Sequence, residues 1–327
     1  MPIVLIHCKP PRVRRSRRRM INGDGSVRCA PEVDCSCLHG PRTRLAALVD
    51  QVPTYDPAGV AAYYDRLGDA AWNRFDQTLG DRISLALHTE AVERAVPHAS
   101  RVLEIGAGPG RFTEVLHGLG CRITVGDLSA TQLDLNRQHA DARGFAASIE
   151  ARHQLDICDL SRFGEASFDA VVALGGPLSY VFDQRDRAVA ECRRVLRPGG
   201  VLLASVMSLW GAAHRHLSDV LALGSAASDD VVHSGDVNTM TVPGSTHPCH
   251  RFRANELRDL LERHNLTDIE VSASSALSTG IPASLVAPGT QQWTTLLALE
   301  RAACAEPGYR DAGTHLIAVA RRPSAST

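Results

Sequence analysis

Three glycines on alternate positions follow a short apolar run in the segment VLEIGAGPGRFTEVL, residues 102–116. Glycine has no Cβ and reaches positive φ, so a turn built from it can approach a ligand closely. The pattern is Gly106-x-Gly108-x-Gly110, and arginine occupies position 111, where a dinucleotide-binding turn has its third glycine. The segment also lacks the Gly-Lys-Ser/Thr ending of a P-loop. Glu104 would repel a pyrophosphate and attract an ammonium or sulfonium group.

The elements around this turn follow an alternating rhythm. Apolar, β-branched runs begin near residues 101, 122, 149, 168 and 199, and helical patterns lie between most of them. Such alternation predicts a parallel sheet covered on both faces. Two last apolar runs, TDIEVSASS and THLIAVARR, favour an antiparallel pair at one edge. We therefore predict a doubly wound α/β fold with a mostly parallel seven-stranded sheet, an antiparallel last strand pair, helices on both faces and a lid insertion.

Five segments resemble landmarks of the class I S-adenosylmethionine (SAM)-dependent methyltransferases. EIGAGPG resembles their first motif, VGDLS places Asp127 at the end of the second strand, and LDICDL places Asp156 after the third. The segments FDAVVALGGPLSYV and RVLRPGGVLLAS then resemble the fourth strand and the turn before the fifth. The resemblance covers roughly residues 60–320. It implies a bacterial small-molecule methyltransferase with SAM as cofactor, S-adenosylhomocysteine as product and no metal.

The resemblance also implies roles for single residues. Glu104 would lie near the amino-acid end of SAM, and Asp127 would accept hydrogen bonds from both ribose hydroxyls. Asp156, with the backbone of Ile157, would meet the adenine, and Asp159 is the alternative for that role. The complete set of implied cofactor-binding residues is Tyr64, Glu104, Gly106, Ala107, Gly108, Gly110, Asp127, Leu128, Asp156, Ile157, Leu174 and Gly175.

Groups that bind the methyl acceptor are expected from the N-terminal helix, the insertion after the fifth strand and the long connection near residues 276–312, because ligands of such sheets bind at the carboxyl ends of the strands. The candidate substrate-binding residues are Tyr63, Trp72, Tyr180, Trp210, His247 and Trp293. The aromatic residues of the N-terminal helix could instead be core residues.

The insertion at residues 207–250 holds five of the chain's 14 histidines. A histidine beside the reacting methyl could act as a general base for a protic acceptor. The candidates are His214, His216 and His233. A polar lid without any catalytic histidine is the alternative, and His214 and His216 would face different sides of a helix.

Composition divides the chain into segments. Residues 1–19 carry seven basic residues and no acid, so the remainder of this chain of net charge −1 has a charge of −8. We expect a disordered basic, cysteine-containing extension at 1–52, a helical segment covering the cofactor site at 53–98, the SAM-binding core at 99–206, a substrate lid at 207–250, the remaining sheet at 251–322 with a helical insertion near 288–306, and a frayed tail at 323–327.

The basic tail and the cysteines bear on location. The tail faintly resembles a twin-arginine signal, but the polar segment INGDGSVRCAPE stands where an apolar region would be required, and Met20 is a candidate internal start. Four of the nine cysteines fall in the first 37 residues, yet Cys29, Cys35, Cys37 and His39 lack the spacing of a zinc site. The other five are scattered singly among apolar residues. We expect a cytoplasmic protein without a bound metal.

The sequence therefore predicts an enzyme that transfers a methyl group from SAM to nitrogen or oxygen of a small molecule, as in natural-product biosynthesis. The segment LGGPLSY lacks the NPPY-like tetrapeptide of base methyltransferases, which argues against nucleic acid as a partner. The alternatives are an RNA or protein methyltransferase tethered by the basic tail, a non-catalytic SAM-binding protein and a dehydrogenase. A membrane partner is not expected, and monomer and homodimer both remain open.

Overall fold

The computed structural model describes residues 53–242 and 244–324. Its main sheet has seven strands in the order β3-β2-β1-β4-β5-β9-β8. The first five strands pair in parallel, whereas β9 runs antiparallel to both β5 and β8. This topology confirms the predicted α/β fold class. The strands are β1 (Arg101–Ile105), β2 (Arg122–Asp127), β3 (Ile149–Gln154), β4 (Phe168–Ala173), β5 (Leu196–Met207), β8 (Thr267–Ala273) and β9 (His315–Arg321).

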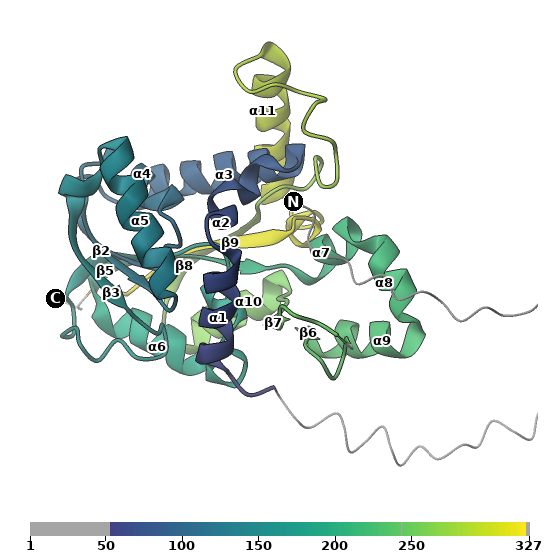
Figure 1. Cartoon of the computed structure of the whole chain (residues 1–327), viewed down its shortest axis with the longest axis horizontal. Coiled ribbons are helices and arrows are strands. Elements are labelled where there is room, and N and C mark those ends of the chain that lie inside the picture. Colours follow the sequence, from purple (N-terminus) through teal and green to yellow (C-terminus); the bar gives the residue numbers. More distant parts are fainter. Residues whose placement is uncertain (1–52, 243, 325–327) are drawn as a thin grey trace, which may run out of the picture. The chain divides into compact units, whose positions relative to one another are not determined.

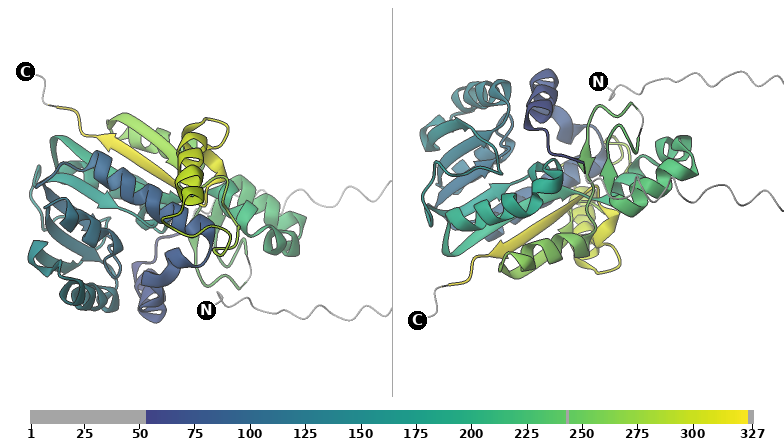
Figure 2. Two further views of the ribbon diagram at one scale, coloured as in Figure 1. Left: turned by 90° about the horizontal axis from the view of Figure 1, so that it is seen from above. Right: turned by 90° about the horizontal axis from the view of Figure 1, so that it is seen from below.

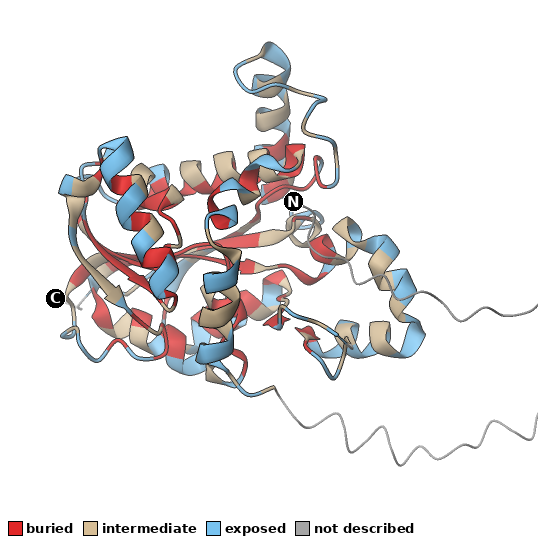
Figure 3. Cartoon of the chain, viewed as in Figure 1, coloured by how far each residue is buried: buried red, intermediate tan, exposed pale blue. Residues whose placement is uncertain are grey.

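Helices cover both faces of the sheet (Figures 1 and 2). One face packs against α3 (Leu79–Ala95), α4 (Arg111–Gly118), α5 (Ala130–Arg143) and α11 (Gln291–Ala305). The other packs against α6 (Arg185–Val195) and α10 (Ala254–Arg263). Strands buried on both faces must be apolar on both, which explains their continuous apolar runs. The central strands are accordingly buried, and the outer helix surfaces are exposed (Figure 3).

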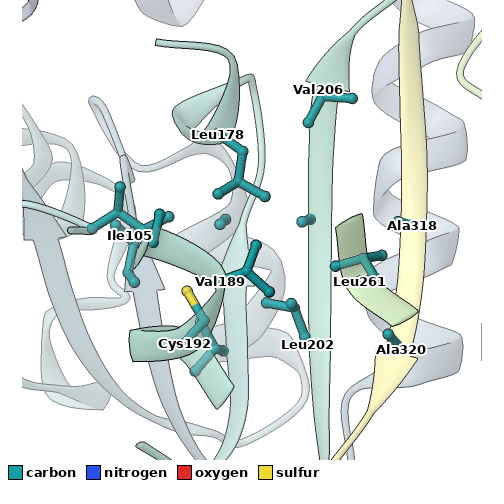
Figure 4. Close-up of a cluster of buried hydrophobic side chains, with 14 of the residues drawn as sticks. Ile105, Leu178, Val189, Cys192, Leu202, Val206, Leu261, Ala318 and Ala320 are labelled. Atoms are coloured by element: carbon teal, nitrogen blue, oxygen red, sulfur yellow. The ribbon is translucent and has the colours of Figure 1, made fainter. Parts of the chain in front are cut away.

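The cluster between the sheet and α6 and α10 shows how the core is filled. Val189 and Cys192 of α6 and Leu261 of α10 are fully buried, together with Leu202 of β5 (Figure 4). Such close packing of side chains from sheet and helices leaves little freedom to the strands. The strand ends that follow β1, β2 and β4 therefore rest on a rigid scaffold.

The N-terminal helical segment predicted at 53–98 begins with short, interrupted helices. The structure has α1 (Pro57–Leu67), then α2 (Ala70–Asn73), then a 3₁₀ turn at Arg74–Asp76. Gly68 ends α1 with φ 55° and ψ −139°, a conformation that strongly favours glycine.

The insertion after β5 contains three short helices and a small strand pair. These are α7 (Leu209–Arg215), α8 (Leu217–Leu223), α9 (Ser225–Ser234), β6 (Asp236–Val237) and β7 (Cys249–His250). In Figure 1, α8 and α9 lie at the opposite end of the view from α4 and α5. Throughout the described ranges, no helix combines the length and the apolar character that crossing a bilayer requires. The predictions for residues 1–52, including the zinc alternative, and for the last three residues lie outside the described residues.

Candidate functional site

A cleft lies at the carboxyl ends of the parallel strands. Its walls come from the segments that follow β1, β2, β3 and β4, and from α1 and α2. The carboxyl ends of parallel strands share one edge of the sheet, so loops distant in sequence meet there. Nine of the predicted cofactor-binding residues line this cleft: Tyr64, Gly106, Ala107, Gly108, Asp127, Leu128, Ile157, Leu174 and Gly175.

The glycine turn after β1 brings bare backbone to the cleft wall. Gly106 has φ +66°, and a Cβ there would lie 2.6 Å from Cγ of Pro177. Its N–H donates to the carbonyl of Gly126 at 2.8 Å, which ties the turn to β2. Gly110 differs from the expectation, because it begins α4 and packs against Asn136 rather than lining the cleft. The turn therefore presents an open, rigid surface, with Gly110 serving the packing of α4.

Asp127 ends β2 with its carboxylate at the cleft. Its side chain is 7 % exposed, and its two oxygens accept hydrogen bonds from the backbone N–H groups of Gly108 and Ser129, each at 2.9 Å. Burial raises the pKa of Asp127 to about 6. Each carboxylate oxygen has a second lone pair, so two further donors can bind. The arrangement suits a ligand with two neighbouring hydroxyl groups.

Glu104 lies behind the cleft wall rather than on it. It is 2 % exposed and accepts a hydrogen bond from Oγ1 of Thr113 in α4 at 2.6 Å. Burial, with the nearby Asp127 carboxylate, raises the pKa of Glu104 to about 8. The structure thus does not place Glu104 in direct contact with the cleft, because its carboxyl group turns toward α4. A cation bound nearby would favour its ionised form.

Asp156 also lies beside the cleft instead of lining it. Its Oδ1 accepts hydrogen bonds from the Tyr55 hydroxyl at 3.1 Å and from the N–H of Cys158 at 2.8 Å. Tyr55 and Ile157 line the cleft next to it. Asp159, the alternative, is exposed and accepts a hydrogen bond from the N–H of Ser161 at 3.1 Å. Geometry therefore favours Asp156 over Asp159 for a contact with a ligand in the cleft.

Arg74 is the main cleft residue that the sequence analysis missed. Its guanidinium lies against Gly175, where any Cβ would collide with it, and 4.8 Å from the ring centroid of Phe75. Within the described ranges, no carboxylate forms an ion pair with it. No local pattern marks this arginine, because its position depends on the break at Gly68. The remaining cleft residues that were not predicted are Tyr55, Val60, Ala71, Phe75, Ile105, Pro109, Arg111, Phe112, Leu155 and Pro177.

A second cavity of about 1130 Å³ adjoins the cleft. It lies between α1 and residues 238–240 and 245–248 of the insertion, and it shares Val60, Tyr64 and Tyr180 with the cleft. The predicted substrate-binding residues Tyr63, Tyr180 and His247 all line it. The structure thus brings three of the six predicted substrate-binding residues together, one of them on the shared wall.

The other three predicted substrate-binding residues lie outside both cavities. Trp72 is buried and stacks on His139, with ring centroids 4.0 Å apart. Trp210 of α7 is 44 % exposed, and Trp293 of α11 packs against the core on one face of the sheet. None of the three lines the cleft or the second cavity, so the structure does not support an acceptor contact for them.

The three predicted base candidates line neither cavity. His214 and His233 are exposed on α7 and α9. His216 lies between α7 and α8, where its Nδ1 is 3.6 Å from Oδ2 of Asp219. The short helices turn these side chains away from the cavities, which could not be read from the enrichment in histidine.

Comparison with known proteins agrees with the geometry. Residues 103–204, from β1 to β5, match a family model described as a methyltransferase domain. This part of the chain is a class I SAM-dependent methyltransferase domain. SAM is the cofactor of that class and S-adenosylhomocysteine its product. The match covers the glycine turn, Asp127 and Asp156, so the resemblance stated from the sequence is confirmed.

The relatives of this methyltransferase domain include enzymes named for small molecules. A ubiquinone biosynthesis O-methyltransferase of Xanthomonas oryzae is 31 % identical over 115 residues, which are 35 % of this chain and 46 % of that protein. A tuberculostearic acid methyltransferase of Mycobacterium tuberculosis is 28 % identical over 167 residues, 50 % of this chain and 36 % of the relative. The chain thus spans less than half the length of these two relatives.

A solved structure shares the fold over most of this chain. The [4+2]-cyclase SpnF superposes with a TM-score of 0.53 at 19 % identity, over 84 % of this chain and 98 % of that one. Because a fold does not fix a reaction, this likeness supports the architecture alone.

Proposed function

We propose that the chain transfers the methyl group of SAM to a nitrogen or oxygen atom of a small molecule, a specialised metabolite, by in-line displacement. The observation that carries this proposal is the pair of adjoining cavities. One is built from the glycine turn and Asp127, and the other shares Val60, Tyr64 and Tyr180 with it. A ligand in each cavity would contact the same three residues, so the two ligands would lie next to each other.

The residues of the cleft fit the parts of SAM. The spare lone pairs of Asp127 suit its two ribose hydroxyls, and the Gly106 turn leaves room for backbone contact. Arg74 offers a cation for the carboxylate of the methionine part. Bound SAM supplies an activated methyl group, so the work of the protein is chiefly alignment and exclusion of water. The buried Tyr180 and the partly buried Tyr64 at the shared wall suit that task.

A small acceptor is supported by the second cavity, which α1 and residues 238–240 and 245–248 line. Such a concave site with four aromatic side chains suits a compact molecule. The names of the relatives, ubiquinone biosynthesis O-methyltransferase and tuberculostearic acid methyltransferase, point the same way. We also propose a cytoplasmic location, which is supported by five buried cysteines that form no disulfide.

The proposal is tested with SAM carrying a trideuteromethyl group. The full chain is incubated with this SAM and an extract of the source cells, which is then separated into small-molecule, RNA and protein fractions. Mass spectrometry is expected to find the label in one small-molecule peak, which identifies the acceptor. Label confined to RNA or protein would overturn the acceptor class. Binding of SAM without any labelled product would point to a non-catalytic SAM-binding protein.

Replacing Arg74 by alanine is expected to weaken SAM binding about 10- to 100-fold, because a hydrogen-bonded charge pair contributes about 1.5–3 kcal/mol. Arg74→Lys should recover part of the affinity, since it restores the charge without the planar fork. Calorimetric titration with SAM measures both variants. Equal affinities of Arg74→Ala and the wild type would show that the guanidinium does not contact the cofactor.

Asp156 and Asp159 form a matched pair for the adenine contact. Asp156→Ala is expected to weaken SAM binding several-fold, because it removes the partner of Tyr55 beside the cleft. Asp159→Ala, three residues away and exposed, should leave the affinity unchanged. Calorimetric titration compares the two. The reverse ranking would assign the contact to Asp159.

A further inference from the structure

Three side chains form one hydrogen-bonded chain along the wall that the two cavities share. The hydroxyls of Tyr64 and Tyr180 lie 2.6 Å apart, and the Tyr180 hydroxyl lies 2.7 Å from Nε2 of His247. Tyr64 and Tyr180 line both cavities, and His247 lines the second. The ring of Tyr63 stacks on His247 at 4.2 Å with an interplanar angle of 6°. Stacking and hydrogen bonding together fix the imidazole and aim its Nε2 at Tyr180.

The electrostatics of this chain set the direction of its hydrogen bonds. Burial and the positive charges of Arg251 and Arg74 lower the pKa of His247 to about 4, so its imidazole is neutral at pH 7 and has one accepting nitrogen. Burial raises the pKa of Tyr180 well above its usual value, so its hydroxyl keeps its proton. The consistent arrangement has Tyr180 donating to Nε2 of His247 and the Tyr64 hydroxyl donating to the Tyr180 oxygen. One lone pair of the Tyr180 oxygen is then left to accept a proton.

The other ring nitrogen of His247 completes the path. With Nε2 accepting, Nδ1 carries the proton of the neutral ring. In the described part of the chain, Nδ1 has no hydrogen-bond partner, and the residue is only partly buried. The neighbours of the ring are Tyr63 of α1, Tyr180, and the cations Arg74 and Arg251. A proton that reaches this ring can therefore leave toward solvent.

We propose that Tyr180 and His247 remove the proton of a hydroxyl group on the methyl acceptor, which is a flat hydroxylated aromatic or conjugated molecule bound in the second cavity. The proposal rests on the proposed methyl transfer and narrows its acceptor. A neutral amine attacks without help from a base, whereas a hydroxyl must lose its proton as it attacks. The flat shape follows from the aromatic side chains that line this cavity: Tyr63, Tyr64, Tyr180 and Phe182.

The step balances in atoms and charge. The acceptor oxygen forms a bond to the methyl carbon while the carbon–sulfur bond breaks, and the electron pair of that bond stays on sulfur. The hydroxyl proton passes to the Tyr180 oxygen as the Tyr180 proton passes to Nε2 of His247. The imidazolium then releases its Nδ1 proton to water. Loss of the sulfonium charge makes that imidazolium easier to form, because a nearby positive charge has disappeared.

The first test requires no acceptor. Histidine-selective ¹³C and ¹⁵N NMR is recorded on the full chain with S-adenosylhomocysteine, or with sinefungin, whose amine supplies a positive charge in place of the sulfonium. We expect His247, assigned from its missing signal in His247→Gln, to hold its proton on Nδ1. Its pKa should be higher with S-adenosylhomocysteine than with sinefungin by about 0.5 or more. A ring protonated on Nε2 in both complexes cannot accept the proton and would overturn the proposal.

The second test separates proton removal from a merely structural role. The probes 7-hydroxycoumarin and 7-aminocoumarin share one flat shape and differ in the attacking group. Tyr180→Phe and His247→Gln are expected to slow methylation of the hydroxyl probe about 100-fold, the typical contribution of a general base, and that of the amine probe less than about 5-fold. Imidazole should restore part of the rate to His247→Ala. The exposed residues Tyr309 and His98 supply the control variants Tyr309→Phe and His98→Gln.

The outcomes are distinct. Equal losses on both probes would assign Tyr180 and His247 a structural role, and methylation of the amine probe alone by the wild type would overturn the hydroxyl acceptor. If neither probe is methylated, the tautomer of His247 found by NMR decides whether the proposed proton removal stands. Failure of the chain to bind S-adenosylhomocysteine in calorimetry would instead contradict the proposed function itself. If the chain binds S-adenosylhomocysteine but His247 carries its proton on Nε2, only the proposed proton removal by Tyr180 and His247 is overturned.

Discussion

Asp127→Ala is expected to weaken SAM binding at least about 100-fold, because two hydrogen bonds to a charged acceptor contribute about 1.5–3 kcal/mol each. The carboxylate is held in place before SAM arrives, by the N–H groups of Gly108 and Ser129 at 2.9 Å each. No other carboxylate lines the cleft among the described residues. No neighbouring carboxylate can therefore replace the hydrogen bonds lost with Asp127. Calorimetric titration with SAM measures the affinity of the variant.

The control for this variant is Asp134→Ala. Asp134 lies on α5, and its ion pair with Arg137 is solvent-exposed, so its removal should leave SAM affinity unchanged. Circular dichroism and thermal unfolding check that both variants fold. An Asp127→Ala protein that folds and binds SAM within about 3-fold of the wild type would contradict the ribose contact.

The raised pKa of Asp127 gives the same contact a pH dependence. With a pKa of about 6, the carboxylate is charged at pH 7.5 and protonated at pH 5. A protonated carboxyl accepts hydrogen bonds less strongly, so SAM affinity should fall as the pH is lowered through 6. Asp127→Asn should lack this fall, because its amide does not titrate between pH 5 and 8. The affinities of both proteins across that range are the measurement.

The parts of the site that directly follow a strand were predictable from the sequence. The glycine turn, Asp127 and Ile157 follow directly after their strands, so strand order alone brings them to one edge. Arg74 was not predictable in this way. It reaches Gly175 only because α1 ends at Gly68, and Gly175 is about a hundred residues further along the chain. Contacts of that kind are set by tertiary packing, which leaves no local pattern.

The histidines illustrate the same limit. Enrichment in the insertion predicted that a histidine would matter, but it gave no means to choose among five. His247 lies 67 residues from Tyr180, its hydrogen-bonding partner, and its neighbours in sequence are ordinary loop residues. His214, His216 and His233 were named as base candidates, and His247 only as a substrate-binding residue. The outcome depended on how α7, α8 and α9 pack, and His214 and His233 are exposed on them.

Replacing His250 is expected to have the second large effect, on the stability of the fold, because its side chain joins the insertion to the core. Its ring is 2 % exposed, with Nδ1 2.6 Å from Oδ1 of Asp236 and Nε2 2.6 Å from Oε1 of Glu256. Asp236 pairs with it across β6 and β7, and Glu256 belongs to α10. His250→Ala leaves two carboxylates without their shared partner. We expect the free energy of unfolding to fall by about 3 kcal/mol, at the lower end for broken buried ion pairs.

The control for His250 is a surface pair of the same chemistry. Nε2 of His264 lies 2.8 Å from Oδ1 of Asp186, whose side chain is 63 % exposed. His264→Ala should cost less than about 1 kcal/mol, as exposed ion pairs do. Urea unfolding at pH 6 measures both variants, and hydrogen exchange of the β6 and β7 amides shows whether the insertion opens first. Similar losses of unfolding free energy in the two variants would show that the buried contacts of His250 stabilise the fold no more than an exposed ion pair does.

The charge on His250 determines how this stability varies with pH. Burial works against the charged ring, but hydrogen bonds to Asp236 and Glu256 outweigh it and raise the pKa of His250 above its usual 6.5. A group whose pKa is raised on folding stabilises the folded state fully below its unfolded pKa, and this stabilisation is lost as the pH rises through the folded pKa. The difference in stability between wild type and His250→Ala should therefore be largest near pH 6 and shrink toward pH 9. A difference that stays constant over this range would show that folding does not shift the pKa of His250, and one that grows toward pH 9 would show that the buried ring is neutral.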